Sequence, residues 1–151
     1  MQISSIPMES LAEILSLQME TGGKARLVVT GWSMHPTFRN RKDVVFLTPV
    51  SRELKKGDLI LYQRKSGQYV LHRIVSKPKN GAFICCGDNQ WEKEPVTLEQ
   101  VIAVTDGFIR GGKEFPENAL GYRLWVSFWL MLFPVRRPIL AVRRLLGRLR
   151  H

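Results

Sequence analysis

Short runs of β-branched and aromatic residues alternate with tight-turn signals between residues 25 and 109, and this alternation limits the fold more than any other feature. The runs predict strands at 26–30, 43–48, 59–63, 68–76, 82–86 and 101–109. Turns such as Ser66-Gly67 and Gly87-Asp88-Asn89 separate them. Strands joined by tight turns pair with their neighbours, so we expect a mainly β chain with an antiparallel β-domain over 25–112.

The segments on either side of this β-domain predict helices. Residues 1–24 carry apolar side chains at helical spacing, which predicts a short amphipathic helix; they are Met8, Leu11, Ile14 and Leu15. This helix is expected to pack on the domain or to dock a partner or a substrate leader. Residues 113–151 read as an apolar and basic helical tail.

The tail contains an apolar run at 124–135 followed by a basic, helix-like stretch. As a helix the run rises only about 18 Å, which is too short for a bilayer core of roughly 30 Å. We therefore expect an interfacial hairpin, with Trp125 and Trp129 at the headgroup level. The expected apolar face of the second helix consists of Ile139, Val142, Leu145, Leu146 and Leu149. The alternative is that the tail packs on the β-domain or on a second copy.

Positive charge is concentrated in the tail. The chain carries a net charge of +10, and residues 118–151 hold seven arginines and no acidic residue. Because this charge is interleaved with apolar residues, we expect residues 123–150 to bind an anionic membrane surface and not nucleic acid. The expected location is a membrane, with the side left open by the sequence, although arginine-rich flanks favour the cytoplasmic leaflet over the outer one.

The sequence predicts neither a metal site nor a cofactor site. It has no Cys-x-x-Cys pair, no His/Cys cluster and no glycine-rich phosphate loop. Its only cysteines, Cys85 and Cys86, are adjacent in a predicted strand, which directs them to opposite faces and disfavours a bridge between them.

The segment 31–37 is the candidate for nucleophilic chemistry. It follows a predicted strand directly, so Ser33 lies on a bend where a hydroxyl is presented to solvent. Pro36 prevents the strand from continuing, and Gly31 permits close backbone approach. We expect Ser33 to be the nucleophile, and its backbone N–H, with the loop at Gly31, to form the oxyanion hole.

A serine hydroxyl needs a base, and the candidates are His35, His72 and His151. His72 lies within a predicted strand, which would hold its imidazole in a fixed position, so it is the preferred base. The base needs a carboxylate to fix its tautomer. Asp88 is the first choice and Glu94 the alternative.

Four motifs in order resemble those of the signal peptidase I family. They are Gly-x-Ser-Met-x-Pro-Thr at 31–37, Gly-Asp-Leu-Ile at 57–60, His-Arg-Ile-Val at 72–75 and Gly-Asp-Asn at 87–89. The resemblance implies a β-rich peptidase fold and a Ser33–His72 pair, similar to the endoplasmic-reticulum, archaeal and sporulation-type branch. It also implies an acidic residue just after Gly-Asp-Asn, where this chain offers Glu92 or Glu94. Bacterial members often have a side-chain hydroxyl in the oxyanion hole at the position of Gly31. In this chain the oxyanion hole would therefore use the Thr30 hydroxyl or backbone N–H groups alone.

The expected function is therefore a serine endopeptidase that cleaves signal or leader peptides through an acyl-enzyme. Its partners would be a precursor or leader peptide and a membrane protein or transporter. One alternative is a self-cleaving regulator similar to the LexA-type repressors, although those use lysine as the base and carry a DNA-binding domain. The other is a peptide-binding module without catalysis.

Overall fold

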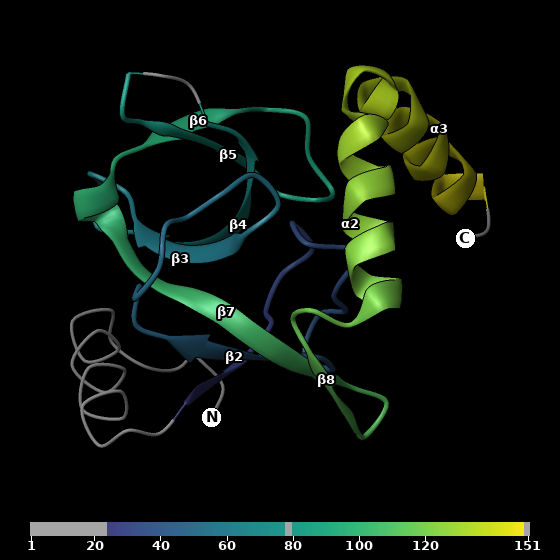
Figure 1. Ribbon diagram of the computed structural model, residues 1–151. Coiled ribbons are helices and arrows are strands. Elements are labelled where there is room, and N and C mark those ends of the chain that lie inside the picture. Colours follow the sequence, from purple (N-terminus) through teal and green to yellow (C-terminus); the bar gives the residue numbers. More distant parts are fainter. Residues whose placement is uncertain (1–23, 78–79, 150–151) are drawn as a thin grey trace.

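The computed structural model describes residues 24–77 and 80–149, which form an antiparallel β-sheet followed by helices (Figure 1). The strands are β1 (Ala25–Val28), β2 (Val44–Thr48), β3 (Leu59–Gln63), β4 (Tyr69–Ser76), β5 (Phe83–Cys86), β6 (Glu94–Val96), β7 (Val101–Arg110) and β8 (Lys113–Pro116). The helices are the 3-10 turns η2 (Leu98–Gln100) and η3 (Phe133–Val135) and the α-helices α2 (Leu120–Met131) and α3 (Arg136–Leu149). The expected antiparallel, mainly β architecture is confirmed. The helix expected within residues 1–24 lies outside the described residues.

The eight strands follow the order β1-β2-β7-β3-β4-β5-β6, and β8 pairs with β7. In the registers, Ile60 of β3 lies opposite His72 of β4, and Arg73 of β4 lies opposite Cys86 of β5. Because side chains alternate along a strand, His72 and Arg73 point to opposite faces of β4. This strand therefore supplies a side chain to each side of the sheet.

The sequence missed β6 and β8, and their residues explain why. Both strands contain a proline, Pro95 and Pro116, which has no N–H to donate to a ladder and which is confined to sheet edges. Each is also only three or four residues long and half polar. Such strands form because a longer partner, β5 or β7, already stands beside them.

The apolar side chains of the sheet form two clusters. One joins β1, β2 and β7 with the loop after β1, and its loop members are Met34 and Phe38, which are 2% and 1% exposed. The other joins β3, β4, β5 and β6, and β3 and β7 contribute residues to both clusters. Met34 and Phe38 therefore anchor the loop that carries Ser33.

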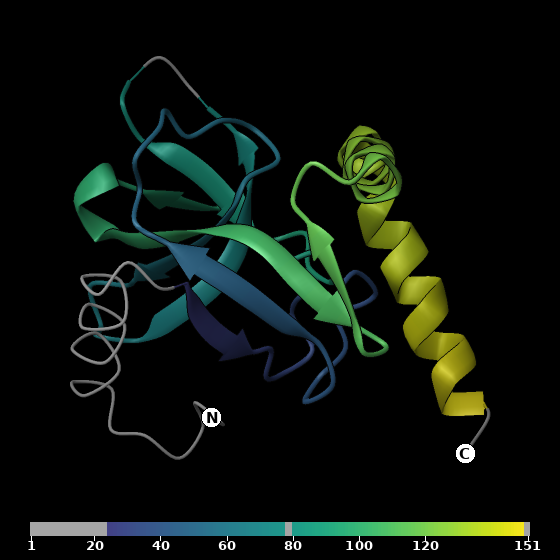
Figure 2. The same ribbon diagram turned by 60° about the horizontal axis from the view of Figure 1, so that its bottom comes forward.

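Helix α2 packs against the β-domain through its two tryptophans, as both ribbon views place it beside the sheet (Figures 1 and 2). The Trp129 side chain is buried and its indole N–H donates to the Asp88 carbonyl oxygen at 2.9 Å. The Trp125 indole N–H donates to the Thr37 hydroxyl at 2.9 Å. These contacts correct the expectation that the tryptophans lie at the lipid headgroup level, because both indole donors are already satisfied within the protein.

A buried ion pair connects β4 to the turn at 87–89. The Arg73 Nε donates to Asp88 Oδ1 and its Nη2 donates to Oδ2, each at 2.9 Å, and both side chains are 1% exposed. The remaining Arg73 nitrogen donates to the Gly57 carbonyl oxygen at 2.9 Å and to the Tyr122 hydroxyl at 3.1 Å. A buried charge is tolerated when its partners satisfy it in this way.

Breaking this pair is expected to destabilise the fold strongly. Arg73→Met leaves the Asp88 carboxylate buried without its counter-charge, which lowers the free energy of unfolding by about 3–5 kcal/mol. Urea unfolding followed by circular dichroism measures the change. Lys77→Met is the matched control, because the Lys77–Glu53 pair is exposed and its loss leaves the midpoint nearly unchanged. Equal midpoints for the two variants would contradict the central role of the pair.

Candidate active site

The Ser33 loop is held against the turn at 87–89. The Ser33 carbonyl oxygen accepts a hydrogen bond from the Asn89 N–H at 2.8 Å. Within the loop, the Phe38 N–H donates to the Met34 carbonyl oxygen at 2.9 Å. With Met34 and Phe38 buried, Ser33 remains half-buried at the surface of a cavity. The loop therefore fixes the serine backbone while leaving its hydroxyl accessible.

Gly87 lies between the Ser33 loop and His72. A Cβ atom at Gly87 would lie 2.6 Å from the Ser33 carbonyl oxygen and 3.1 Å from His72 Nε2. The first distance is shorter than real contacts allow, so this position requires glycine. Because one Cβ position would meet both atoms, His72 Nε2 and the Ser33 carbonyl oxygen lie on the same side of Gly87.

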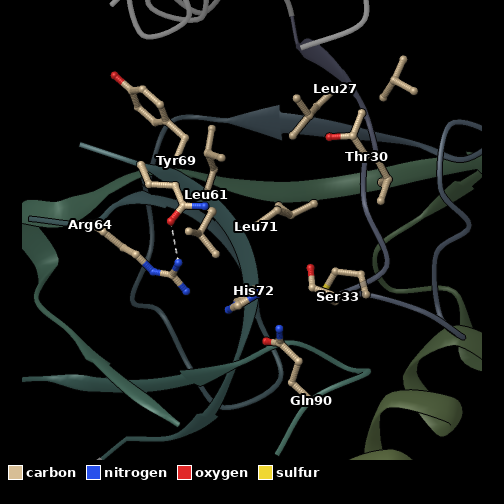
Figure 3. Close-up of a pocket in the computed structure, with 14 residues that line it drawn as sticks. Leu27, Thr30, Ser33, Leu61, Arg64, Tyr69, Leu71, His72 and Gln90 are labelled. Carbon is tan, nitrogen blue, oxygen red and sulfur yellow. Dashed lines mark hydrogen bonds between the residues drawn. The ribbon is translucent and has the colours of Figure 1, made fainter. Parts of the chain in front are cut away.

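Ser33 and His72 line one cavity of about 330 Å³, in which Figure 3 shows the two side chains next to each other. Its walls come from the end of β1 and the loop after it, and from β3 and β4. Half of the lining residues are apolar; they are Leu27, Val28, Val29, Met34, Leu61, Val70 and Leu71. Polar side chains line the rest; they are Thr30, Arg64, Gln68, Tyr69 and Gln90. The cavity thus has an apolar floor beside a serine and an imidazole.

The other ring nitrogen of His72 faces a second group of polar residues. His72 Nδ1 lies 3.3 Å from the Tyr62 hydroxyl and 3.6 Å from Glu94 Oε1. The Tyr62 hydroxyl donates a short hydrogen bond to the same Glu94 oxygen. Arg64 then forms an ion pair with Glu94 at 2.7 Å. A continuous chain of polar contacts therefore runs from His72 through Tyr62 and Glu94 to Arg64.

This arrangement fixes the protonation of His72. Burial raises the pKa of Glu94, but hydrogen bonds from Arg64 and Tyr62 outweigh that effect and leave its pKa below the ordinary value. The ionised carboxylate only accepts, so the Tyr62 O–H is directed to Glu94 and its oxygen accepts from His72 Nδ1–H. Nε2 is then the unprotonated nitrogen, on the side of Ser33. Burial lowers the pKa of His72 to about 4, although the Glu94 charge opposes that shift.

Asp88, the first sequence choice for orienting His72, is not brought to it. Both of its carboxylate oxygens bind the Arg73 guanidinium, and one also accepts from the Thr37 hydroxyl at 2.5 Å. Its side chain makes no hydrogen bond to His72 among the residues that the structure describes. The sequence predicted that Asp88, in the Gly87-Asp88-Asn89 turn, would orient His72. In the structure the side chain that β4 directs to this turn is Arg73 and not His72.

Glu94, the alternative, is the carboxylate that reaches His72, and Glu92 is exposed. The difference follows from β6. Glu94 is the first residue of that strand and lies opposite Cys85 of β5, next to β4 in the sheet. Glu92 precedes the strand and is directed away.

The candidate oxyanion hole differs from the expectation at Gly31. The Gly31 N–H donates to the Asn40 side chain at 2.8 Å, so it is not free for a substrate oxygen. The Ser33 N–H makes no hydrogen bond within the described part of the chain. Thr30 lines the cavity beside it. The donors available are therefore the Ser33 amide and the Thr30 hydroxyl.

The remaining sequence candidates lie away from this site. His35 Nδ1 contacts the Arg143 guanidinium at 2.8 Å, and burial followed by the charge of Arg143 lowers the pKa of His35. His151 lies outside the described residues. Cys85 and Cys86 are buried free thiols, and burial raises their pKa values to about 12 and about 11. In residues 24–77 and 80–149 no cluster of three metal-ligating side chains occurs.

Sequence reasoning missed Tyr62, because it read this residue only as part of a buried strand. Tyr62 is fully buried on β3, two residues after Ile60, which pairs with His72. A diagonal neighbour across an antiparallel pair lies within reach of a long aromatic side chain. The register of β3 against β4 was the missing information.

No family model matches the chain, and a search of curated proteins found none that resembles it.

The burial of His72 predicts an unusual titration. We expect a His72 pKa of about 4 instead of the ordinary value near 6.5, measured by NMR of the imidazole protons and assigned with His72→Gln. Glu94→Gln removes a nearby negative charge and lowers this pKa further, whereas Glu92→Gln leaves it unchanged. A titration near 6.5 in the wild type would show that the imidazole is solvated and the described site is incorrect.

Proposed function

We propose that this chain is a serine peptidase of the signal peptidase I type, in which Ser33 is the nucleophile and His72 is the general base. The observation that carries the proposal is the placement of both side chains on one cavity, with the unprotonated His72 Nε2 on the side of Ser33. The resemblance of the four sequence motifs adds independent support. A neutral, fixed imidazole beside a serine is the arrangement that activates a hydroxyl.

The reaction would follow the acyl-enzyme route. His72 Nε2 takes the hydroxyl proton while Ser33 Oγ bonds to the carbonyl carbon of the scissile peptide. The imidazolium then protonates the leaving nitrogen, and the C–N bond breaks. Water repeats the sequence on the ester, which releases the new carboxylate and restores the Ser33 hydroxyl. The Ser33 N–H stabilises the negative oxygen formed in both steps.

Tyr62 and Glu94 would position the base. As His72 becomes charged, the Tyr62 oxygen accepts its Nδ1–H and the Glu94 carboxylate, 3.6 Å from Nδ1, stabilises the positive charge. Arg64 holds Glu94 in place and keeps it ionised. Tyr62 thus lies between the base His72 and the carboxylate of Glu94. In a Ser–His–Asp triad, by contrast, the carboxylate accepts directly from the histidine N–H.

The substrate would be an extended peptide, and its proposed source is a signal or leader segment of a precursor. Strand β1 ends the sheet order, so its outer edge is unpaired within the described residues and is available to an added strand. The cavity beside this edge has an apolar floor that suits small aliphatic side chains. A transporter or membrane protein that delivers the precursor is the second partner implied by the motif resemblance.

The direct test is cleavage of a panel of leader peptides with small residues before the cut, read by mass spectrometry. Wild type is expected to cleave, while Ser33→Ala and His72→Ala lose on the order of a thousandfold or more in rate. A fluorophosphonate probe should label wild type and not Ser33→Ala.

A cleaving Ser33→Ala variant would overturn the assignment of the nucleophile. Absence of both cleavage and labelling in wild type would favour a peptide-binding module. Cleavage of the chain itself in preference to any added peptide would favour a self-cleaving regulator.

The positioning role predicts a graded loss of rate. Tyr62→Phe removes the acceptor of the His72 N–H and should slow kcat about tenfold to a hundredfold, the value of a buried hydrogen bond. Glu94→Gln should act similarly, and Glu92→Gln should have no effect. The change should fall on kcat with KM nearly constant, and circular dichroism should confirm intact folding. A Tyr62→Phe enzyme with wild-type kcat would refute the role.

A further inference from the structure

Among the described residues, the helical tail carries most of the large hydrophobic side chains that are exposed. Large hydrophobic side chains that are exposed in the described residues fall mainly on α2, η3 and α3; they are Leu120, Leu124, Phe128, Met131, Val135, Val142, Leu145, Leu146 and Leu149. Only Trp32 and Leu98 belong to the β-domain. A concentration of this kind marks an interaction surface.

Helix α3 buries Arg136 and Leu140 against the protein, and Arg143 and Arg144 lie on this same side. The Arg136 side chain is buried between the rings of Trp129 and Phe133, at 5.0 and 4.4 Å from their centroids. Arg144 lies 4.8 Å from the Trp91 ring, and Arg143 contacts His35. The leucines on the other side of the helix, with 54–75% exposure, therefore face outwards. A surface helix normally has the reverse orientation.

Helix α2 differs from α3 on its inner side, which is apolar, but it too exposes large apolar side chains on its outer side. Its inner side carries Trp125, Val126 and Trp129, which contact the β-domain or are buried, and its outer side carries leucines, Phe128 and Met131. Figures 1 and 2 show both helices on the same side of the β-domain. Their outer faces contain no acidic residue, since none occurs in residues 118–151.

We infer that the outer faces of α2 and α3 form a docking surface for an anionic lipid bilayer, into which their apolar side chains insert. No single helix in the described residues is long and apolar enough to cross a membrane, although α2 and the segment Phe133–Leu149 reach that threshold as a pair bent by 57°. The axes of two helices joined at an angle define a plane, so both can lie along the same interface.

The positive charge of the tail favours an anionic bilayer over a second copy of the chain as the partner of this surface. No arginine of the tail from Arg123 to Arg148 forms a salt bridge in the described part of the chain. A second copy seated on this face would bring two acid-free, arginine-bearing helices together, which like-charge repulsion opposes. Anionic headgroups supply the missing counter-charge, and acyl chains cover the leucines. The surface differs from the one expected from sequence, because Trp125 and Trp129 face the protein.

Vesicle flotation with the full chain tests the inference. We expect binding to phosphatidylcholine vesicles with about one quarter phosphatidylglycerol, weaker binding to pure phosphatidylcholine, and a decrease between about 0.1 M and about 0.5 M salt. Leu145→Asp combined with Leu149→Asp should lower binding on the order of tenfold or more. Leu98→Asp is the control for an added charge elsewhere, since Leu98 is 56% exposed, close to the 59% of Leu145, but lies on the β-domain.

Equal binding by the double variant and the control would overturn the assignment of this face. If light scattering shows a wild-type dimer that dissociates in the double variant, the face is a site of self-association and the lipid assignment is wrong. If the vesicle-bound chain resists carbonate extraction, the helices span the bilayer as a pair and the interfacial assignment is wrong. Peptide cleavage in solution is a separate readout. A double variant that cleaves soluble peptide normally but does not float supports the docking surface independently of the proposed peptidase activity.

Discussion

The buried Arg73–Asp88 pair is the interaction on which the rest of this structure depends. Arg73 ties β4 to the turn at 87–89 and, through Gly57 and Tyr122, to the turn before β3 and to α2. Around Asp88, the Thr37 hydroxyl binds the carboxylate and the Trp129 indole binds the carbonyl oxygen. The loop that carries Ser33, the strand that carries His72 and the helical tail therefore meet at one desolvated ion pair, where removal of either charged side chain leaves the other without its counter-charge.

The two acidic residues that follow β5 have divided roles. Asp88 is fully desolvated and matched by a guanidinium, so its oxygens bind Arg73 and Thr37 and not the His72 ring. Glu94 is partly exposed, with 28% of its side chain accessible, and it contacts both Tyr62 and His72. Alternation along β4 produces this division, since consecutive residues face opposite sides of the sheet and each meets a different carboxylate.

The candidate site could be predicted in part. Ser33 and His72 were identified from a serine on a bend after a strand and from a histidine within one, and the structure places both on the same cavity. The choice between Asp88 and Glu94 could not be made from spacing, because both lie within reach along the chain. Tyr62 and the occupied N–H of Gly31 depend on strand register and on a loop contact with Asn40, which no local pattern encodes.

The sequence by itself determined the mainly β architecture, the principal strands and the helical character of the tail, because side-chain periodicity and turn residues act over a few neighbouring positions. Tertiary structure decided which carboxylate reaches His72, the formation of β6 and β8, and the direction in which each helix of the tail faces. Those outcomes depend on partners distant in the chain. Arg136 becomes a buried group because the rings of Trp129 and Phe133 are brought to it, while Leu145, Leu146 and Leu149, further along α3, stay exposed.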